Sequence, residues 1–207
     1  MRTRVKICGI TRVEDAEAAS AHGADAIGLI FYRPSPRYVA PERAREIVAA
    51  TPAFVTTVAV FVNPSREEVE AVIRESGITL LQFHGDETPD FCASFSRPYI
   101  KAARIRPELD LLKYLSPHTE ARAWMLDAFH GDLWGGTGGA FDWSLVPRDA
   151  AKPIILSGGL TADNVAGAVR RVRPYAVDVS TGVEASKGIK DAAKIAAFIG
   201  AVKREDS

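Results

Sequence analysis

The side chains that could carry chemistry in this chain come at the ends of short apolar runs. Cys8 ends the run Val5–Cys8, and Asp127 ends the run Ala123–Asp127. A carboxyl group in apolar surroundings can have a raised pKa and donate a proton near neutral pH. A cysteine can act as a base or nucleophile when it is a thiolate. From position alone, an inert buried thiol and a salt-bridged or helix-capping carboxylate remain alternative interpretations.

Two glycine-containing turns follow apolar runs near the C-terminal end of the sequence. Ser157-Gly158-Gly159 follows Pro153–Leu156, and Ser180-Thr181-Gly182 follows Ala176–Val179. Such turns, when they lead into helix N-termini, point backbone N–H groups and a helix dipole at an anion. A tight turn with no ligand is the alternative for Gly158 and Gly159. We predict that the two turns are neighbours and form a phosphate site.

Other polar residues are weaker candidates. Arg37 lies in the proline-rich segment Pro34–Tyr38 and could bind a carboxylate with two hydrogen bonds, or could be a solvated loop arginine. His84 is the best candidate among four histidines, but no Cys/His spacing typical of a metal site accompanies it. His22 and His118 are expected at the surface.

Two further features receive structural interpretations. Cys92 is expected to pack in the core. The glycine-rich segment Gly131–Gly139, which His130 precedes, lacks the Lys-Ser/Thr of a phosphate-binding P-loop and is interpreted as a mobile lid.

The candidate residues must be positioned by a repeated strand–helix pattern. About eight such repeats with short connections predict parallel strands, either in an open doubly wound sheet or in a closed (β/α)8 barrel. The count and the absence of Gly-x-Gly-x-x-Gly in the first turn favour the barrel, as a single domain over 1–207. The predicted strands are Val5–Cys8, Ala26–Phe31, Phe54–Val62, Ile78–Phe83, Tyr99–Ala102, Ala123–Asp127, Pro153–Leu156 and Ala176–Val179. Helices are expected over Val13–His22, Pro41–Ala50, 65–77, Pro89–Phe95, Leu109–Leu115, from about 161, and Lys190–Val202.

Length and composition narrow the class of protein. The chain has 207 residues, fewer than the roughly 250 typical of this barrel, so we expect short helices after strands four, five and six. Its 47% hydrophobic content argues against disorder, and equal numbers of acidic and basic residues argue against a nucleic-acid or anionic-membrane partner. No apolar run reaches the ~18 residues of a membrane helix. Two cysteines form no disulfide framework, so a cytoplasmic protein is expected.

Taken together, the segments at the strand ends resemble phosphoribosylanthranilate isomerase of tryptophan biosynthesis. The resemblance covers essentially the whole chain, with the motifs in order. The family often has Leu at Phe83, Ala at Ser157, Ser at Thr181 and Pro at Lys187, and none of these departures removes a proposed catalytic group. The matching segments are Lys6–Thr11, Ser35-Pro36-Arg37, Val60–Asn63, Gln82–Gly85, Leu126-Asp127-Ala128, Gly135–Gly138, Phe141-Asp142-Trp143, Gly158-Gly159-Leu160, Asn164-Val165 and Asp178–Glu184.

The resemblance implies an Amadori rearrangement of an aminoaldose phosphate to an aminoketose phosphate, without a metal or organic cofactor. It implies that Asp127 is the general acid and Cys8 the general base, with Lys6 or backbone amides favouring the thiolate. Arg37 would hold the anthranilate carboxylate. The expected partner is the sugar-phosphate substrate, and the protein is expected to be a monomer or homodimer. The residues expected to complete the substrate-binding set are Gly158, Gly159, Asp178, Ser180 and Thr181.

Three alternatives remain at this point. A histidine-pathway aminoaldose isomerase has similar chemistry, but it places an aspartate where this chain has Cys8. A barrel that binds phosphate without catalysis would bind sugar phosphates unchanged. A redox role for Cys8 is not supported by a Cys-x-x-Cys motif.

Overall fold

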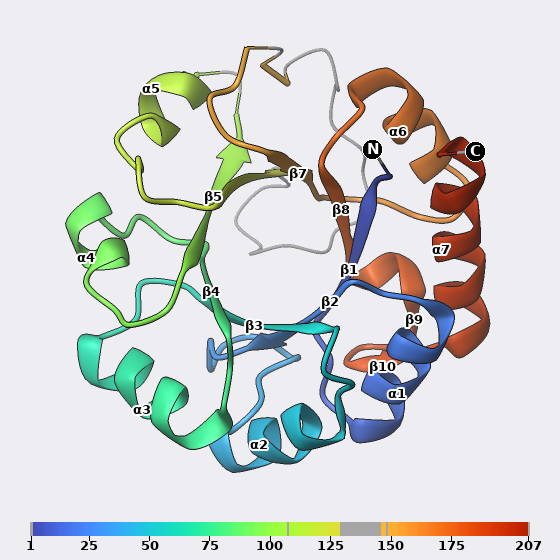
Figure 1. Cartoon of the computed structure of the whole chain (residues 1–207), viewed down its shortest axis with the longest axis horizontal. Helices are drawn as coiled ribbons and strands as arrows, with labels where there is room; N and C mark the ends of the chain where they lie inside the picture. The colour runs from blue at the N-terminus through green and yellow to red at the C-terminus, as the bar shows by residue number, and fades with distance from the viewer. Residues whose placement is uncertain (1, 107, 129–145, 148, 207) are drawn as a thin grey trace.

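Eight parallel strands close into a barrel in sequence order (Figure 1). The computed structural model describes residues 2–106, 108–128, 146–147 and 149–206. The barrel strands are β1 (Arg4–Cys8), β2 (Ala26–Ile30), β3 (Thr56–Phe61), β4 (Leu80–Phe83), β5 (Tyr99–Ile105), β6 (Ala123–Ala128), β7 (Ile154–Leu156) and β8 (Ala176–Val179). Pairing of β1 with β8 closes the ring, with Lys6 opposite Asp178 in the register. The predicted (β/α)8 barrel is therefore confirmed.

Helices surround the barrel on the outside, and α7 packs between α1 and α6 (Figure 1). The described helices are α1 (Val13–His22), α2 (Pro41–Ala50), α3 (Arg66–Ser76), α4 (Pro89–Ala93), α5 (Leu111–Leu115), α6 (Val165–Val172) and α7 (Ala192–Glu205), with the short 3-10 helix η2 (Thr181–Val183). None of the helices in the described part of the chain is long and apolar enough to cross a bilayer.

Local sequence signals set the helix ends. Ser65 caps α3 through its side chain, and Glu68 returns the bond to the Ser65 backbone, forming a capping box. Gly23 and Gly77 end α1 and α3 in the left-handed conformation, where glycine is favoured. These signals explain why the end of α1 and both ends of α3 could be placed from the sequence.

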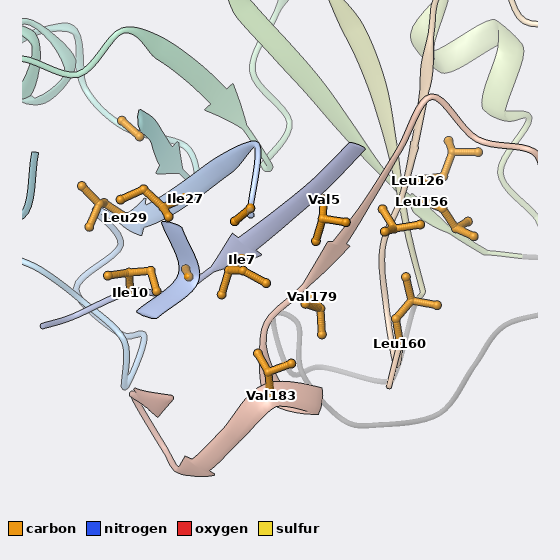
Figure 2. Close-up of a cluster of buried hydrophobic side chains, with 14 of the residues drawn as sticks. Val5, Ile7, Ile10, Ile27, Leu29, Leu126, Leu156, Leu160, Val179 and Val183 are labelled. Atoms are coloured by element: carbon orange, nitrogen blue, oxygen red, sulfur yellow. The ribbon is translucent and has the colours of Figure 1, made fainter. Parts of the chain in front are cut away.

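Side chains alternate between the inside of the barrel and the outer layer along every strand. On β1, Lys6 and Cys8 point to the interior, whereas Val5 and Ile7 belong to the outer hydrophobic core. Figure 2 shows this outer core, in which strand residues meet Ile10, Leu160 and Val183 from the loops that follow β1, β7 and β8. The apolar residues of the barrel interior form a separate cluster, which consists of Ile100, Ala102, Ala123, Met125, Ile155 and Ala176, with Leu80 packed against it. The alternation thus leaves the polar inner residues at the C-terminal ends of the strands.

The element predictions differ from the structure in a few places. Helices α4 and α5 have 5 residues each, which confirms the expected short helices after β4 and β5. The expected helix after β6 lies outside the described residues. Ile189–Lys190 is the strand β10, paired with β9 (Glu184–Ser186), so the predicted helical start at Lys190 is wrong and α7 begins at Ala192. No periodicity marks so short a hairpin.

His118 is buried, and its expected surface position is wrong. It is 3% exposed, with its ring 6.2 Å from that of Tyr99 and 6.5 Å from that of Tyr114. Burial, with the nearby charge of Lys101, lowers the pKa of His118 to about 4. Pro117 indicates a turn, and a turn is usually exposed. Tyr99 on β5 and Tyr114 on α5 nevertheless cover His118.

This burial predicts an acid-sensitive stability. Because the pKa of His118 falls from an ordinary 6.5 to about 4, the unfolded chain binds more protons than the folded protein between these pH values. His118 should therefore reduce the free energy of unfolding by about 2 kcal/mol when pH falls from about 7 to about 5. Urea unfolding of the wild type and of His118→Phe at both pH values measures the effect. An equal pH dependence in the two proteins would contradict it.

Candidate active site

A cavity opens at the C-terminal ends of the strands and collects the inward-facing polar residues. All eight strands, or the loops directly after them, contribute to its wall. The residues from strands and loops that line it include Cys8, Ile30, Arg37, Val60, Gln82, His84, Arg104, Asp127, Ser157, Gly158, Gly159, Asp178, Ser180 and Thr181. Every catalytic and substrate-binding residue expected from the sequence thus lies at one cavity.

Cys8 lies beside a buried ion pair. Lys6 Nζ donates a hydrogen bond of 2.7 Å to Asp178 Oδ1, and Ser157 Oγ donates one of 3.1 Å to Asp178 Oδ2. A β-carbon at Gly28 would lie 2.8 Å from Cys8 Sγ and 3.1 Å from Lys6 Nζ, so only glycine leaves room for both groups here. Asp178, which the resemblance places in the substrate set, is held by internal partners and orients the lysine next to the thiol.

The electrostatic environment of Cys8 favours the thiol over the thiolate. Burial raises the pKa of Cys8 above its ordinary value, and the charge of Asp178 adds to this effect. The charges of Lys6 and Lys190 and a hydrogen bond with Lys6 oppose the increase without cancelling it. Burial also acts to lower the pKa of Lys6, but Asp178 and Cys8 outweigh it and hold the lysine charged. Lys6 therefore places a positive charge next to the Cys8 thiol.

Asp127 is buried on β6 and faces a histidine from β4. It is 4% exposed, and its Oδ2 lies 3.1 Å from His84 Nε2. Gln82 Nε2 lies 3.1 Å from His84 Nδ1 on the other side of the ring. Arg104, opposite Asp127 in the β5–β6 register, also lines the cavity. Burial lowers the pKa of Arg104, which the charge of Asp127 raises in part.

Arg37 is buried and forms a two-point salt bridge with Glu184. Its Nε and Nη2 donate hydrogen bonds of 2.6 and 2.7 Å to the two carboxylate oxygens of Glu184, and Lys190 Nζ lies 3.0 Å from the same carboxylate. The interpretation of Arg37 as a solvated loop residue is therefore wrong. Burial acts to raise the pKa of Glu184, but Arg37 and Lys190 together lower it, so the carboxylate stays charged and fixes the guanidinium at the cavity.

The two turns expected to bind phosphate are adjacent. Gly158 and Gly159 have backbone φ angles of 93° and 64°, which residues other than glycine rarely adopt. A β-carbon at Gly182 would lie 2.0 Å from the Leu160 carbonyl oxygen, so the turn after β8 touches the one after β7. Asn164 Nδ2 donates to the Gly159 carbonyl and holds the first turn. Helix α6 begins only at Val165, beyond this turn, and η2 begins at Thr181 itself.

The remaining cysteine and histidines expected from the sequence do not line the cavity where the structure describes them. Cys92 is fully buried in the outer core, as expected, and burial raises its pKa to about 12. His22 is exposed, as expected. His130 and the segment Gly131–Gly139, interpreted as a lid, lie outside the described residues. Within the described ranges, no cluster of three or more His, Cys, Asp or Glu could hold a metal ion.

The structure adds residues that sequence reasoning did not assign. The sequence places Gln82 and Glu184 in matching segments and makes His84 the best histidine candidate, but it assigns no role to any of these residues or to Arg104. Glu184 is close to Ser180 in sequence but contacts Arg37 across 147 positions. The alternation of inward and outward side chains along β4 and the residue after it could have placed Gln82 and His84 inside the barrel. Their hydrogen-bond partners could not be predicted, because these contacts depend on how the strands pair in the closed barrel.

Comparison with known proteins identifies the family. The family model described as N-(5'phosphoribosyl)anthranilate (PRA) isomerase matches residues 5–201. The N-(5'-phosphoribosyl)anthranilate isomerase of Dechloromonas aromatica is 56% identical over 206 residues, which cover 100% of this chain and 99% of the relative. That of Pseudomonas paraeruginosa is 59% identical over 200 residues, covering 97% and 95% of the two chains.

Solved structures agree with this relationship. The phosphoribosyl anthranilate isomerase of Thermotoga maritima is 42% identical and superposes with a TM-score of 0.91, covering 98% of this chain and 99% of that one. A phosphoribosyl anthranilate isomerase in complex with reduced 1-(o-carboxyphenylamino)-1-deoxyribulose 5-phosphate is 41% identical, with a TM-score of 0.87 and the same coverage. A 3-hexulose-6-phosphate synthase at 16% identity and a TM-score of 0.72 shares the fold alone. The chain is thus an enzyme that belongs to the phosphoribosylanthranilate isomerase family.

Proposed function

We propose that this enzyme converts N-(5-phosphoribosyl)anthranilate to 1-(2-carboxyphenylamino)-1-deoxyribulose 5-phosphate in tryptophan biosynthesis, with Asp127 as general acid and Cys8 as general base. One observation carries the proposal. A carboxyl group and a thiol line the same cavity as the adjacent turns at Gly158-Gly159 and Ser180-Thr181. An acid, a base and an anion-binding wall are the three parts that this rearrangement needs.

The first two proton transfers of the reaction occur at the ring oxygen and at C2, the two atoms on either side of C1. Asp127 protonates the furanose ring oxygen while the C1–O bond breaks and the nitrogen lone pair forms a Schiff base with C1. The positive imine acidifies the proton on C2, and the Cys8 thiolate removes it to give an enolamine. The enolamine then becomes the ketone when the C2 hydroxyl group loses its proton and C1 gains one. Substrate and product are isomers, so the steps balance without an oxidant or a reductant.

Cys8 can serve as a base only through its neighbours, because burial favours the neutral thiol. Lys6, fixed by Asp178, supplies the opposing positive charge next to the sulfur. A thiol with a high pKa leaves little thiolate at neutral pH, but that thiolate is a strong base. Asp178 thus supports the base and contacts the substrate only as part of the cavity wall.

The two anionic groups of the substrate have separate sites in this proposal. The 5-phosphate binds to backbone N–H groups around Gly158, Gly159, Ser180 and Thr181. Arg37 holds the anthranilate carboxylate. Its Nε–Nη2 edge is occupied by Glu184, so the donors left for the substrate are on the Nη1 side. We propose one domain over 1–207 that works in the cytoplasm as a monomer or homodimer.

A coupled assay with freshly made phosphoribosylanthranilate tests the function. We expect turnover by the wild type, and losses in kcat of about 100-fold or more for Asp127→Asn and for Cys8→Ser, because each removes a proton-transfer group. Thermal unfolding serves as the control, with little change expected in either variant. Ordinary turnover after either substitution would contradict the assignment of that residue, and an inactive wild type would contradict the function.

The raised pKa of Cys8 predicts a second measurable property. The rate at which iodoacetamide modifies Cys8 should rise by about tenfold per pH unit wherever the thiol of the free enzyme is protonated, because only the thiolate reacts. A product analogue should protect Cys8 from this modification. Cys8→Ser is the control, because buried Cys92, with its pKa of about 12, should not react. A rate of modification that does not change between about pH 6 and 8 would contradict the raised pKa of Cys8.

A further inference from the structure

Gln82 and His84 line the cavity, and the proposed reaction gives neither of them a task. They stand two positions apart at the end of β4, so both side chains face the barrel interior. Gln82 is 1% exposed, its Nε2 lies 3.1 Å from His84 Nδ1, and its buried Oε1 has no hydrogen-bond partner among the described residues. A buried amide is costly unless it is bonded, which indicates that the contact with His84 orders both side chains.

The His84 ring is held at both nitrogens. Its Nδ1 faces Gln82 Nε2, and its Nε2 faces Asp127 Oδ2, each at 3.1 Å. With the Gln82 amide in this orientation its nitrogen donates the hydrogen bond, so Nδ1 accepts it. A neutral imidazole then carries its proton on Nε2 and donates it to the carboxylate of Asp127. The chain Gln82–His84–Asp127 therefore has one consistent direction of donation.

The loop that carries His84 is rigidly held. Lys101 Nζ donates hydrogen bonds of 2.5 Å to the Gly85 carbonyl and 2.7 Å to Glu87 Oε2, and both Lys101 and Glu87 are almost completely buried. The Glu87 carboxylate also accepts hydrogen bonds from the backbone N–H groups of Gly85 and Asn63. This buried ion pair fixes the residue next to His84, so the ring has a defined position relative to Asp127.

We propose that His84 is a positioning residue for Asp127 and that Gln82 sets the tautomer in which it does so. The Nε2–H bond fixes Oδ2 of Asp127, which leaves Oδ1 as the oxygen that exchanges a proton in the cavity. A neutral donor orients the carboxyl group without adding a positive charge beside it. The inference rests on the proposed role of Asp127 as acid, whereas the hydrogen-bonded chain itself stands on geometry.

Nitrogen NMR of the full-length protein at neutral pH measures the tautomer directly, without substrate. In the wild type we expect His84 to be neutral and protonated at Nε2, with His84→Gln used to assign its signals. In Gln82→Glu the new carboxylate can only accept, so we expect a proton on Nδ1. Buried His118, whose pKa is about 4, gives a neutral reference in the same spectrum. A wild-type His84 protonated at Nδ1 or at both nitrogens would overturn the proposal.

Matched variants test the effect on the reaction. We expect kcat to fall at least about tenfold in His84→Phe and in Gln82→Glu, with KM changed less than about twofold, because an acid with the wrong partner is misoriented. His84→Gln should recover much of the loss, since its amide can donate to Asp127, and Gln82→Met should lie between wild type and Gln82→Glu. Wild-type kcat in His84→Phe, with thermal stability unchanged, would overturn the positioning role.

These two experiments separate this inference from the proposed function. If the wild type did not convert phosphoribosylanthranilate, the function would fail while the tautomer measurement could still confirm the chain from Gln82 to Asp127. If the wild type were active but His84 carried its proton on Nδ1, the function would stand and the positioning role would fail.

Discussion

The alternation of side chains along eight parallel strands, closed by the pairing of β1 with β8, is the constraint on which the site depends. It sends one set of residues to the outer core and the other into the barrel. Lys6 and Asp178 come from the two strands that complete the closure, and they meet only because the ring is closed. A register shift by one residue on either strand would turn these groups toward the helices and leave their charges buried among apolar side chains.

Buried charges are costly, and several near this cavity have an oppositely charged partner within hydrogen-bond distance. Lys6 pairs with Asp178, Arg37 and Lys190 with Glu184, and Lys101 with Glu87. Such pairs contribute little net stability when compared with apolar side chains, but they fix geometry. Here they fix a positive charge beside Cys8, a guanidinium at the cavity and the loop that carries His84. The chain has no net charge, but charged side chains are held at fixed positions around the cavity.

The sequence was sufficient for the fold and for most of the cavity wall because both follow from local patterns. Apolar runs at regular spacing predicted the strands, and the last residue of each run predicted Cys8, Asp127 and the glycine turns. Contacts between distant strands were not predictable in this way. The bond from Glu184 to Arg37, the burial of His118 under Tyr99 and the chain from Gln82 to Asp127 depend on register and packing. The raised pKa of Cys8 likewise depends on burial that no motif encodes.

In the proposed mechanism, Cys8 and Asp127 act at C2 and at the ring oxygen of one substrate, on either side of C1, while its phosphate lies on the turns after β7 and β8. A crystal structure of this protein with the reduced product analogue, 1-(o-carboxyphenylamino)-1-deoxyribulose 5-phosphate in its reduced form, tests it most directly. We expect the phosphate at Gly158, Gly159, Ser180 and Thr181, with Cys8 Sγ and an oxygen of Asp127 both in contact with the sugar chain. A phosphate bound on the β3–β6 side of the cavity, or a sugar chain out of reach of either group, would contradict it.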